Sequence, residues 1–137
     1  TLINYLNNHM MKKYNIDMEL PLEDVGESLL QDIEKISPFG SENPHPLFLE
    51  KNLSFREIRK FGVDQRHFNG ILVKEGKEYP AVGFDLGHRI HLDTYLAQSF
   101  DIVYYPEKVN LHGEKMIQIR IKDIIIKDEF YDIFIKS

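Results

Sequence analysis

The chain has 137 residues, no cysteine and a formal net charge of −5 at pH 7. A chain of this length can bury a single core unaided, and without cysteine it has neither a disulfide framework nor a thiolate metal site. No apolar run approaches the roughly 20 residues of a membrane span, and the N-terminus lacks the apolar segment of a signal peptide, so we expect a cytoplasmic protein with no membrane partner.

The charge is divided unevenly along the chain. Residues 1–50 hold 3 Lys or Arg against 9 Asp or Glu, whereas residues 51–126 hold 12 against 10. The middle of the chain is therefore mildly basic, which permits a polyanionic partner there without requiring one. An ordinary solvated surface accounts equally well for this balance.

The first 37 residues have the pattern of a helical segment that leads into a separate domain. Apolar residues recur at helical spacing over residues 2–10, and residues 16–20 alternate as a short strand does. A second helix is predicted after Pro21, with an apolar stripe made of Val25, Leu29, Ile33 and Ile36. Because the chain begins at Thr1 within helix-like sequence, we expect it to be part of a longer protein.

Residues 38–48, with the sequence PFGSENPHPLF, form a proline-rich connector. Pro38 is expected to end the preceding helix. Because proline fixes φ, we expect the connector to act as a strut and not as a hinge, with Phe39 and Phe48 anchored in the apolar interior. The connector motif comprises Pro38, Phe39, Gly40, Asn43, Pro44, Pro46 and Phe48.

After residue 48 the hydrophobic period changes from that of a helix to two. Five segments have strand character, at residues 53–58, 67–73, 78–84, 100–105 and 116–124, and a short helix is predicted at 92–98. This order predicts a mainly β fold, a five-stranded OB-type antiparallel barrel, which is α+β overall when the helical linker is included. The predicted divisions are a helical linker over 1–37, the barrel over 38–126 and a tail over 127–137.

The last strand has the clearest alternation. Ile117, Ile119 and Ile121 fall on one face, whereas the other face carries Gln118, Arg120 and Lys122. A hairpin turn around Asn110 and Gly113 is predicted before it. The polar face is either an ordinary solvated surface or a set of hydrogen-bond donors for a ligand.

Three stretches carry a resemblance to a known family. Residues 38–48, the sequence AVGF at 81–84, and VNLHGEKMIQIRIKDI at 109–124 occur in this order and spacing. Together they resemble the C-terminal OB-fold region of the RecJ-type single-strand-specific exonucleases. The resemblance covers most of residues 28–125, and the acidic front is similar to the linker that enters this domain from the nuclease core.

The sequence departs from the pattern of that family at three places. Glu42 stands where the family usually has a glycine, and a non-glycine residue at positive φ costs about 1 kcal/mol. His67 matches a histidine of the family, but Phe-Asn-Gly at 68–70 replaces Leu-Lys-Leu and removes a basic side chain. The tail at 127–137 has no feature of the family.

The resemblance implies a single-stranded-DNA-binding domain of a 5′-to-3′ exonuclease that acts in DNA repair and recombination. Its implied partners are single-stranded DNA and the nuclease core of the parent enzyme. The Asp-His-His and Gly-Gly-His motifs of that core do not occur in this chain. Because two-metal cleavage needs clustered carboxylates, we expect this chain alone to be inactive and to need no cofactor, with Mn or Mg bound by the core.

Basic and aromatic side chains are the candidates for contacting DNA. Phosphate contacts are expected from Arg56, Arg59, Lys60, Arg66, Lys108, Lys115, Arg120 and Lys122, with Gln118 as a further donor on the last strand. The candidates for stacking are Phe61, Phe68, Tyr104 and Tyr105. Alternation sends the two tyrosines to opposite faces, so at most one of them is a platform. Core packing is expected of Phe55, Phe84 and Phe100.

Two alternatives remain open. OB barrels also bind proteins, so the chain is alternatively an interaction or scaffolding module that braces the nuclease core or binds a repair or replication protein. A zinc or manganese site built from Asp85, His88, His91 and Asp93 is disfavoured, because three-residue spacing gathers ligands only on a helix and this stretch is not helical in pattern.

Overall fold

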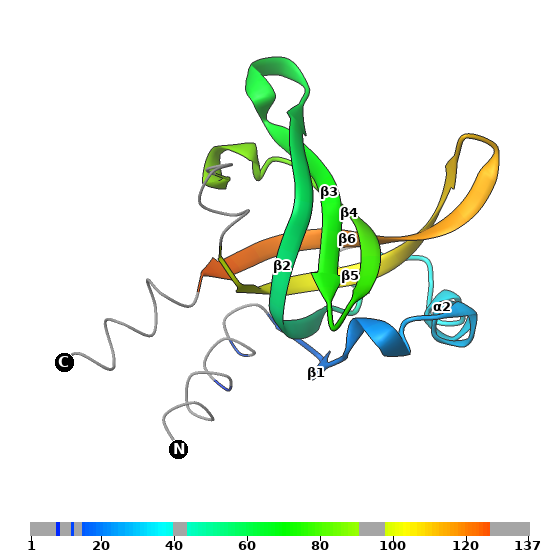
Figure 1. Ribbon diagram of the computed structural model, residues 1–137. Coiled ribbons are helices and arrows are strands. Elements are labelled where there is room, and N and C mark those ends of the chain that lie inside the picture. Colours follow the sequence, from blue (N-terminus) through cyan, green and yellow to red (C-terminus); the bar gives the residue numbers. More distant parts are fainter. Residues whose placement is uncertain (1–7, 9–11, 13–14, 40–43, 91–97, 127–137) are drawn as a thin grey trace.

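The computed structural model describes residues 8, 12, 15–39, 44–90 and 98–126. Five strands close into a barrel in the order β2-β3-β4-β6-β5, with β5 pairing back to β2 (Figure 1). This confirms the OB-type barrel. The strands are β2 (Phe48–Phe61), β3 (His67–Lys74), β4 (Lys77–Gly83), β5 (Phe100–Leu111) and β6 (Glu114–Ile126).

One strand pair of the barrel departs from the expected antiparallel arrangement. β4 and β6 run parallel, with Ala81 paired to Ile119 and Val82 paired to Arg120. The other four pairs of the barrel are antiparallel. The reason is geometric, because direction cannot alternate at every neighbour in a closed ring of five strands. The parallel pair places the end of β4 beside the polar face of β6.

The N-terminal part of the described chain packs onto one end of the barrel. A two-residue strand, β1 (Met18–Glu19), pairs in parallel with the start of β2. The 3-10 turn η1 (Leu22–Asp24) and the helix α2 (Glu27–Glu34) follow. The helices expected at 2–10 and 92–98 fall outside the described residues, apart from Asn8 and Gln98.

The apolar stripe expected for the second helix is only partly correct. Leu30 and Ile33 are its buried residues, whereas Ile36 is 52% exposed. The helix ends at Glu34, so Ile36 no longer follows its period. Among the described residues no helix is long and apolar enough to cross a membrane.

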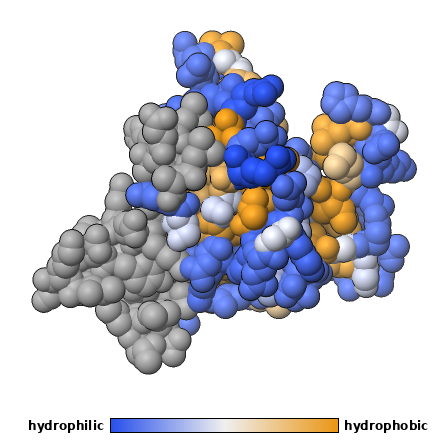
Figure 2. Space-filling view, in the orientation of Figure 1, coloured by the Kyte–Doolittle hydropathy of each residue, from blue (hydrophilic) through white to orange (hydrophobic). Residues whose placement is uncertain are grey.

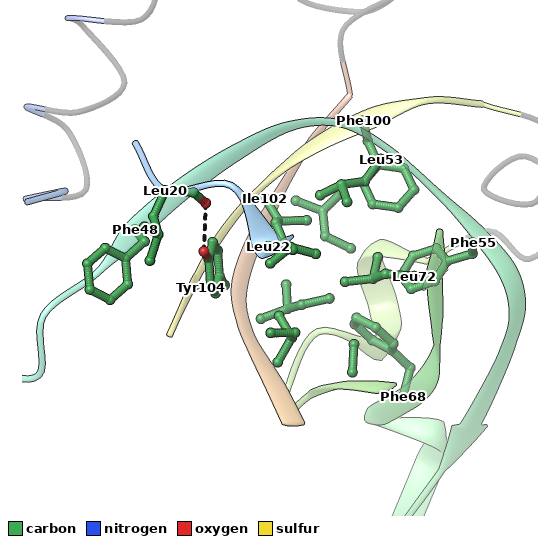
Figure 3. Close-up of a cluster of buried hydrophobic side chains, with 14 of the residues drawn as sticks. Leu20, Leu22, Phe48, Leu53, Phe55, Phe68, Leu72, Phe100, Ile102 and Tyr104 are labelled. Carbon is green, nitrogen blue, oxygen red and sulfur yellow. Dashed lines mark hydrogen bonds between the residues drawn. The ribbon is translucent and has the colours of Figure 1, made fainter. Parts of the chain in front are cut away.

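The core lies inside the barrel and extends to the N-terminal segment (Figure 3). Leu20 and Leu22, which fall in the region expected to be a linker, pack in the same cluster as Phe48 and Leu72. The hydroxyl of Tyr104 donates a hydrogen bond to the carbonyl of Leu20 at 2.7 Å, shown as the dashed line in Figure 3. Residues before the connector therefore complete the core of the barrel.

A buried carboxylate also ties the N-terminal segment to the barrel. Glu50 is only 6% exposed and accepts hydrogen bonds from the backbone N–H groups of Leu22 and Lys51, both at 2.8 Å. The ammonium of Lys74 donates to the same carboxylate at 2.7 Å. A buried charge requires such partners, so this cluster links η1, β2 and β3 as one unit.

Two hairpins project beyond the barrel (Figure 1). The β5–β6 hairpin turns at His112 and Gly113, both at positive φ, as a two-residue turn of this kind requires, which confirms the predicted turn. Figure 2 shows hydrophobic residues gathered toward this hairpin, where Met116 is exposed. The β2–β3 hairpin is held by the N–H of Gly87, which donates to the carbonyl of Arg66 at 2.8 Å.

Candidate nucleic-acid interface

A row of paired residues crosses four interstrand pairings on the outer face of the barrel. Arg59 on β2 pairs with Asn69 on β3, and Asn69 pairs with Val82 on β4. Val82 pairs with Arg120 on β6, which in turn pairs with Tyr105 on β5. Because directly paired residues point to the same side of a sheet, these five side chains share one face.

Three rings gather at the end of this row near the β2–β3 hairpin. The ring centre of His67 lies 5.3 Å from those of Phe61 and Phe84. Phe61 and Phe84 meet edge to face at 6.3 Å. The guanidinium of Arg120 lies 4.6 Å from the centre of the Phe84 ring, a cation–π distance. Phe84 is 41% exposed, so much of its ring remains open to a ligand.

The same chain of contacts continues from Arg120 to the connector. The guanidinium of Arg120 is 5.8 Å from the centre of the Tyr105 ring. Tyr105 stacks on His45 at 3.8 Å and 27°, and His45 lies 4.3 Å from Phe39. We call this set the aromatic row, and its members are Phe39, His45, Tyr105, Arg120, Phe84, His67 and Phe61.

Hydrogen bonds and steric contacts orient the rings of the aromatic row. The N–H of Asp85 donates to Nδ1 of His67 at 3.0 Å, so the proton of a neutral His67 resides on Nε2. Nδ1 of His45 lies 3.0 Å from the carbonyl oxygen of Pro46, and it carries a proton because that oxygen can only accept. Gly62 has a φ of 86°, and a Cβ there would lie 2.7 Å from Cδ2 of His67.

The hydroxyl of Tyr105 remains protonated at neutral pH. Burial raises its pKa, and the nearby Arg120 guanidinium acts in the opposite direction. A neutral phenol can donate a hydrogen bond as well as stack. Tyr105 therefore offers a ligand both a ring and a polar atom.

Half of the eight basic residues expected to contact phosphates are already paired with carboxylates. One of these pairs is the hydrogen bond from the Lys108 ammonium to Glu27, which raises the pKa of Lys108. The pairs are Arg56–Glu78 (2.8 Å), Arg66–Asp85 (2.9 Å), Lys108–Glu27 (2.7 Å) and Arg120–Glu107 (3.5 Å). Most of these pairs are exposed, so each stabilises the fold little, but each also lowers the local positive charge.

The other four basic residues form no ion pair within the described chain, and they divide by strand face. Arg59 belongs to the paired row. Lys122 is the exposed residue at the bulge where the β5–β6 register shifts, and because its neighbour Ile121 packs in the core, Lys122 faces outward as Arg120 does. Lys60 pairs with the buried Phe68, so it lies on the opposite side of the sheet. Lys115 is exposed near the β5–β6 turn, at an odd spacing from Arg120. Of these four described cations, only two therefore share the face of the aromatic row.

The expected stacking residues are placed differently from one another. Phe68 and Tyr104 are both 0% exposed, and these positions in the core correct the stacking role expected of them. Phe61 and Tyr105 are half-buried at the surface, as a platform requires. Gln118 is half-buried and pairs across the strands with Glu107.

Phe84 was expected in the core and is exposed instead. Ala81 packs in the core cluster and Gly83 lies against the ring of Phe68, so alternation turns Val82 and Phe84 to the other side, where Val82 is still buried and Phe84 is exposed. Gly83 is needed there because a Cβ would lie 2.3 Å from the ring of Phe68. The small residues Ala81 and Gly83, two positions apart, are the sequence feature from which this orientation could have been predicted.

The connector is anchored at both described ends. Phe48 is buried in the core, as expected, and Phe39 packs partly against the same cluster. Pro44 is exposed and Pro46 half-buried, while Pro38 is exposed just after α2. Gly40, Glu42 and Asn43 fall outside the described residues.

The disfavoured metal site has no support from the residues that the structure describes. Asp85 is engaged by Arg66, and His88 is exposed on the 3-10 turn η3 (Gly87–Arg89). His91 and Asp93 lie outside the described part. Within that part, no three His, Cys, Asp or Glu side chains are placed to hold a metal ion.

Comparisons with known proteins agree with the resemblance seen in the sequence. The RecJ OB domain profile matches residues 16–123. The single-stranded-DNA-specific exonuclease RecJ of Bacillus subtilis (strain 168) is 29% identical over 113 residues, which are 82% of this chain and 14% of that protein. The crystal structure of RecJ in complex with Mg²⁺ from Thermus thermophilus is 19% identical, covering 71% of this chain and 14% of that one, with a TM-score of 0.48. Since the profile spans most of the sequence, the chain belongs to the RecJ OB domain family.

Proposed function

We propose that this chain is the single-stranded-DNA-binding domain of a RecJ-type 5′-to-3′ exonuclease that acts in DNA repair and recombination. The chain spans 14% of the RecJ relative that it matches, so a nuclease core elsewhere in the parent protein supplies cleavage with Mn or Mg. The observation that carries the proposal is the open ring of Phe84, backed by Arg120 at 4.6 Å.

In this proposal a single strand lies across the outer face along the aromatic row. One base stacks on the open part of Phe84, because every base has a π-face and stacking tolerates any sequence. Phe61 and Tyr105 lie on either side of this platform and contact the neighbouring bases. A duplex hides its base faces, so it cannot use these rings, and the surface selects single strands.

The connector sets the direction in which the strand leaves the barrel. Phe48 fixes one end in the core, and His45 fixes the middle against Tyr105. We propose that this rigid segment holds the barrel at a constant angle to the nuclease core. A strand bound along the aromatic row is then delivered to the core along one path.

Binding of a fluorescently labelled single-stranded oligonucleotide, followed by anisotropy, tests the proposal. The 137-residue chain should bind the single strand more tightly than the duplex of the same sequence. Equal affinity for the two, or no binding of either at low salt, contradicts the proposal.

A protein-interaction role is the second candidate, and the charge pairing favours it. Four of the expected phosphate contacts face carboxylates, which leaves a nearly neutral surface with an exposed ring. Exposed aromatic residues on such a surface are typical of protein interfaces. Absence of DNA binding, together with retention of a repair or replication protein that is lost in Phe84→Ala, would support this role instead.

A further inference from the structure

The outer face of the barrel combines open rings with little net positive charge. Arg56, Arg66 and Arg120 each have a carboxylate partner. A phosphate that displaced one of these partners would leave an unpaired carboxylate beside it, so the exchange gains little.

The guanidinium of Arg120 is already engaged within the protein and is poorly available to a DNA phosphate. Its guanidinium is bonded to Glu107 at 3.5 Å and lies over Phe84 at 4.6 Å. In this position it supports the rings of the aromatic row from within. Its positive charge is divided between a carboxylate and the face of Phe84, as in other cation–π contacts.

We infer that this surface holds a single strand mainly through its bases and only weakly through its phosphates. The inference rests on the proposed function and specifies its ligand as a strand with unstacked bases, in contrast to a generic polyanion. An abasic strand of the same length and charge is therefore a poor ligand.

The inference predicts how far the affinity for a single strand falls as the salt concentration rises. If only Arg59 and Lys122 contact phosphates, each releasing about 0.7 counterion, affinity falls about sevenfold between roughly 50 and 200 mM salt. If all eight basic residues contacted phosphates, the same change in salt would lower affinity about 2,000-fold. The two modes of binding are therefore far apart in a simple titration.

The experiment compares oligothymidylate of about 12 nucleotides with an abasic oligomer of equal length, each titrated with the 137-residue chain at both salt concentrations. We expect the abasic oligomer to bind at least about tenfold more weakly, because loss of each stacked base costs about fivefold or more and the abasic oligomer loses more than one. The salt effect on oligothymidylate should be within about threefold of the sevenfold value.

Two double variants compare the contributions of these cations to the salt dependence. One removes Arg59 and Lys122, on the face of the aromatic row, and the other removes Lys60 and Lys115, on the opposite side of the sheet. Arg59→Gln with Lys122→Gln should remove most of the remaining salt dependence. Lys60→Gln with Lys115→Gln removes the same formal charge and should leave the salt dependence unchanged.

Two results would overturn the inference while leaving the binding of single-stranded DNA by this chain intact. The first is that the abasic oligomer binds as tightly as oligothymidylate. The second is that the affinity for oligothymidylate falls several hundredfold or more between the two salt concentrations. If neither oligomer binds at low salt, the proposed function fails and the inference fails with it. Phe84→Ala checks the site, since it should reduce the preference for oligothymidylate over the abasic oligomer.

Discussion

The guanidinium of Arg120 lies 4.6 Å from the centre of the Phe84 ring, although the two residues are far apart along the chain. The parallel pairing of Val82 with Arg120 brings them together, because Phe84 follows Val82 by two residues on the same side of β4. A ring thus becomes a surface platform at the point where barrel closure joins β4 to β6.

Phe84→Ala should weaken binding of single-stranded DNA about fivefold to a hundredfold, the range for loss of one stacked base. The ring is substantially exposed, so the free energy of unfolding should change by less than about 1 kcal/mol. Anisotropy titration and urea unfolding measure the two effects. Met18→Ala is the control, because Met18 is also exposed, at 49%, but pairs with the start of β2, at the opposite end of that strand from Phe61, which contacts Phe84. A similar loss of affinity in both variants would remove Phe84 from the proposed site.

Tyr104→Phe should have the opposite profile. The change removes the hydroxyl that bonds the carbonyl of Leu20 and leaves that buried acceptor unpaired, at a cost of about 1–3 kcal/mol. Affinity for single-stranded DNA should be unchanged, because the ring lies in the core. Urea unfolding and anisotropy test this, and weaker DNA binding by a stably folded variant would contradict the core role.

Lys74→Met should destabilise the fold by about 2–4 kcal/mol, because it leaves the Glu50 carboxylate buried without its cation. Lys77→Met removes an exposed partner of Glu23, 3.7 Å away, and should change stability by less than about 0.5 kcal/mol. Chemical denaturation of the two variants compares a buried pair with an exposed one in the same part of the fold. Equal effects would show that the Glu50 cluster does not anchor η1.

Gly62→Ala and Gly76→Ala form a second matched pair. Both glycines have positive φ, so each substitution should cost about 1 kcal/mol of stability. Only at Gly62 would the new methyl group press on His67, whereas Gly76 has open space around it. Affinity for single-stranded DNA should therefore fall in Gly62→Ala alone. If Gly76→Ala weakens binding equally, the effect is general strain and not the position of His67.

Pro44→Ala combined with Pro46→Ala tests the connector in the full-length exonuclease that we propose as the parent protein. Without the two fixed φ angles the connector should move more freely, so the enzyme should release its strand earlier. Processivity on a long single strand is the measurement. Unchanged processivity would count against the strut, and affinity of the isolated 137-residue chain should stay the same in either case.

Regular alternation made much of the fold predictable from the sequence. The isoleucines at 119 and 121 point into the barrel as expected, because a core on one side imposes a period of two on a strand. Gly113 likewise identified the β5–β6 turn, since few residues adopt positive φ at low cost. The N-terminal segment was less predictable, because its burial depends on meeting the open end of a barrel.

The candidate site was only partly predictable. Phe61, Tyr105 and Arg120 were proposed from the sequence, whereas His45, His67 and Phe84 were not placed with them. Aromatic residues occur in cores and at surfaces alike, so residue type could not separate Phe84 from Phe68. The carboxylate partners of the arginines were also hidden, because Arg66 and Asp85 meet only after β3 and β4 have paired.

The sequence by itself determined the local properties of this protein: which segments are strands, where the turns lie, and that the chain resembles the RecJ OB region. These properties depend on neighbouring residues and on periodicity, which are present in one dimension. The tertiary structure alone decided which rings face outward together and which cations keep a free charge. Those properties depend on interstrand register and on barrel closure, which join residues far apart in the chain, such as Arg59, Arg120 and Tyr105, along a single face.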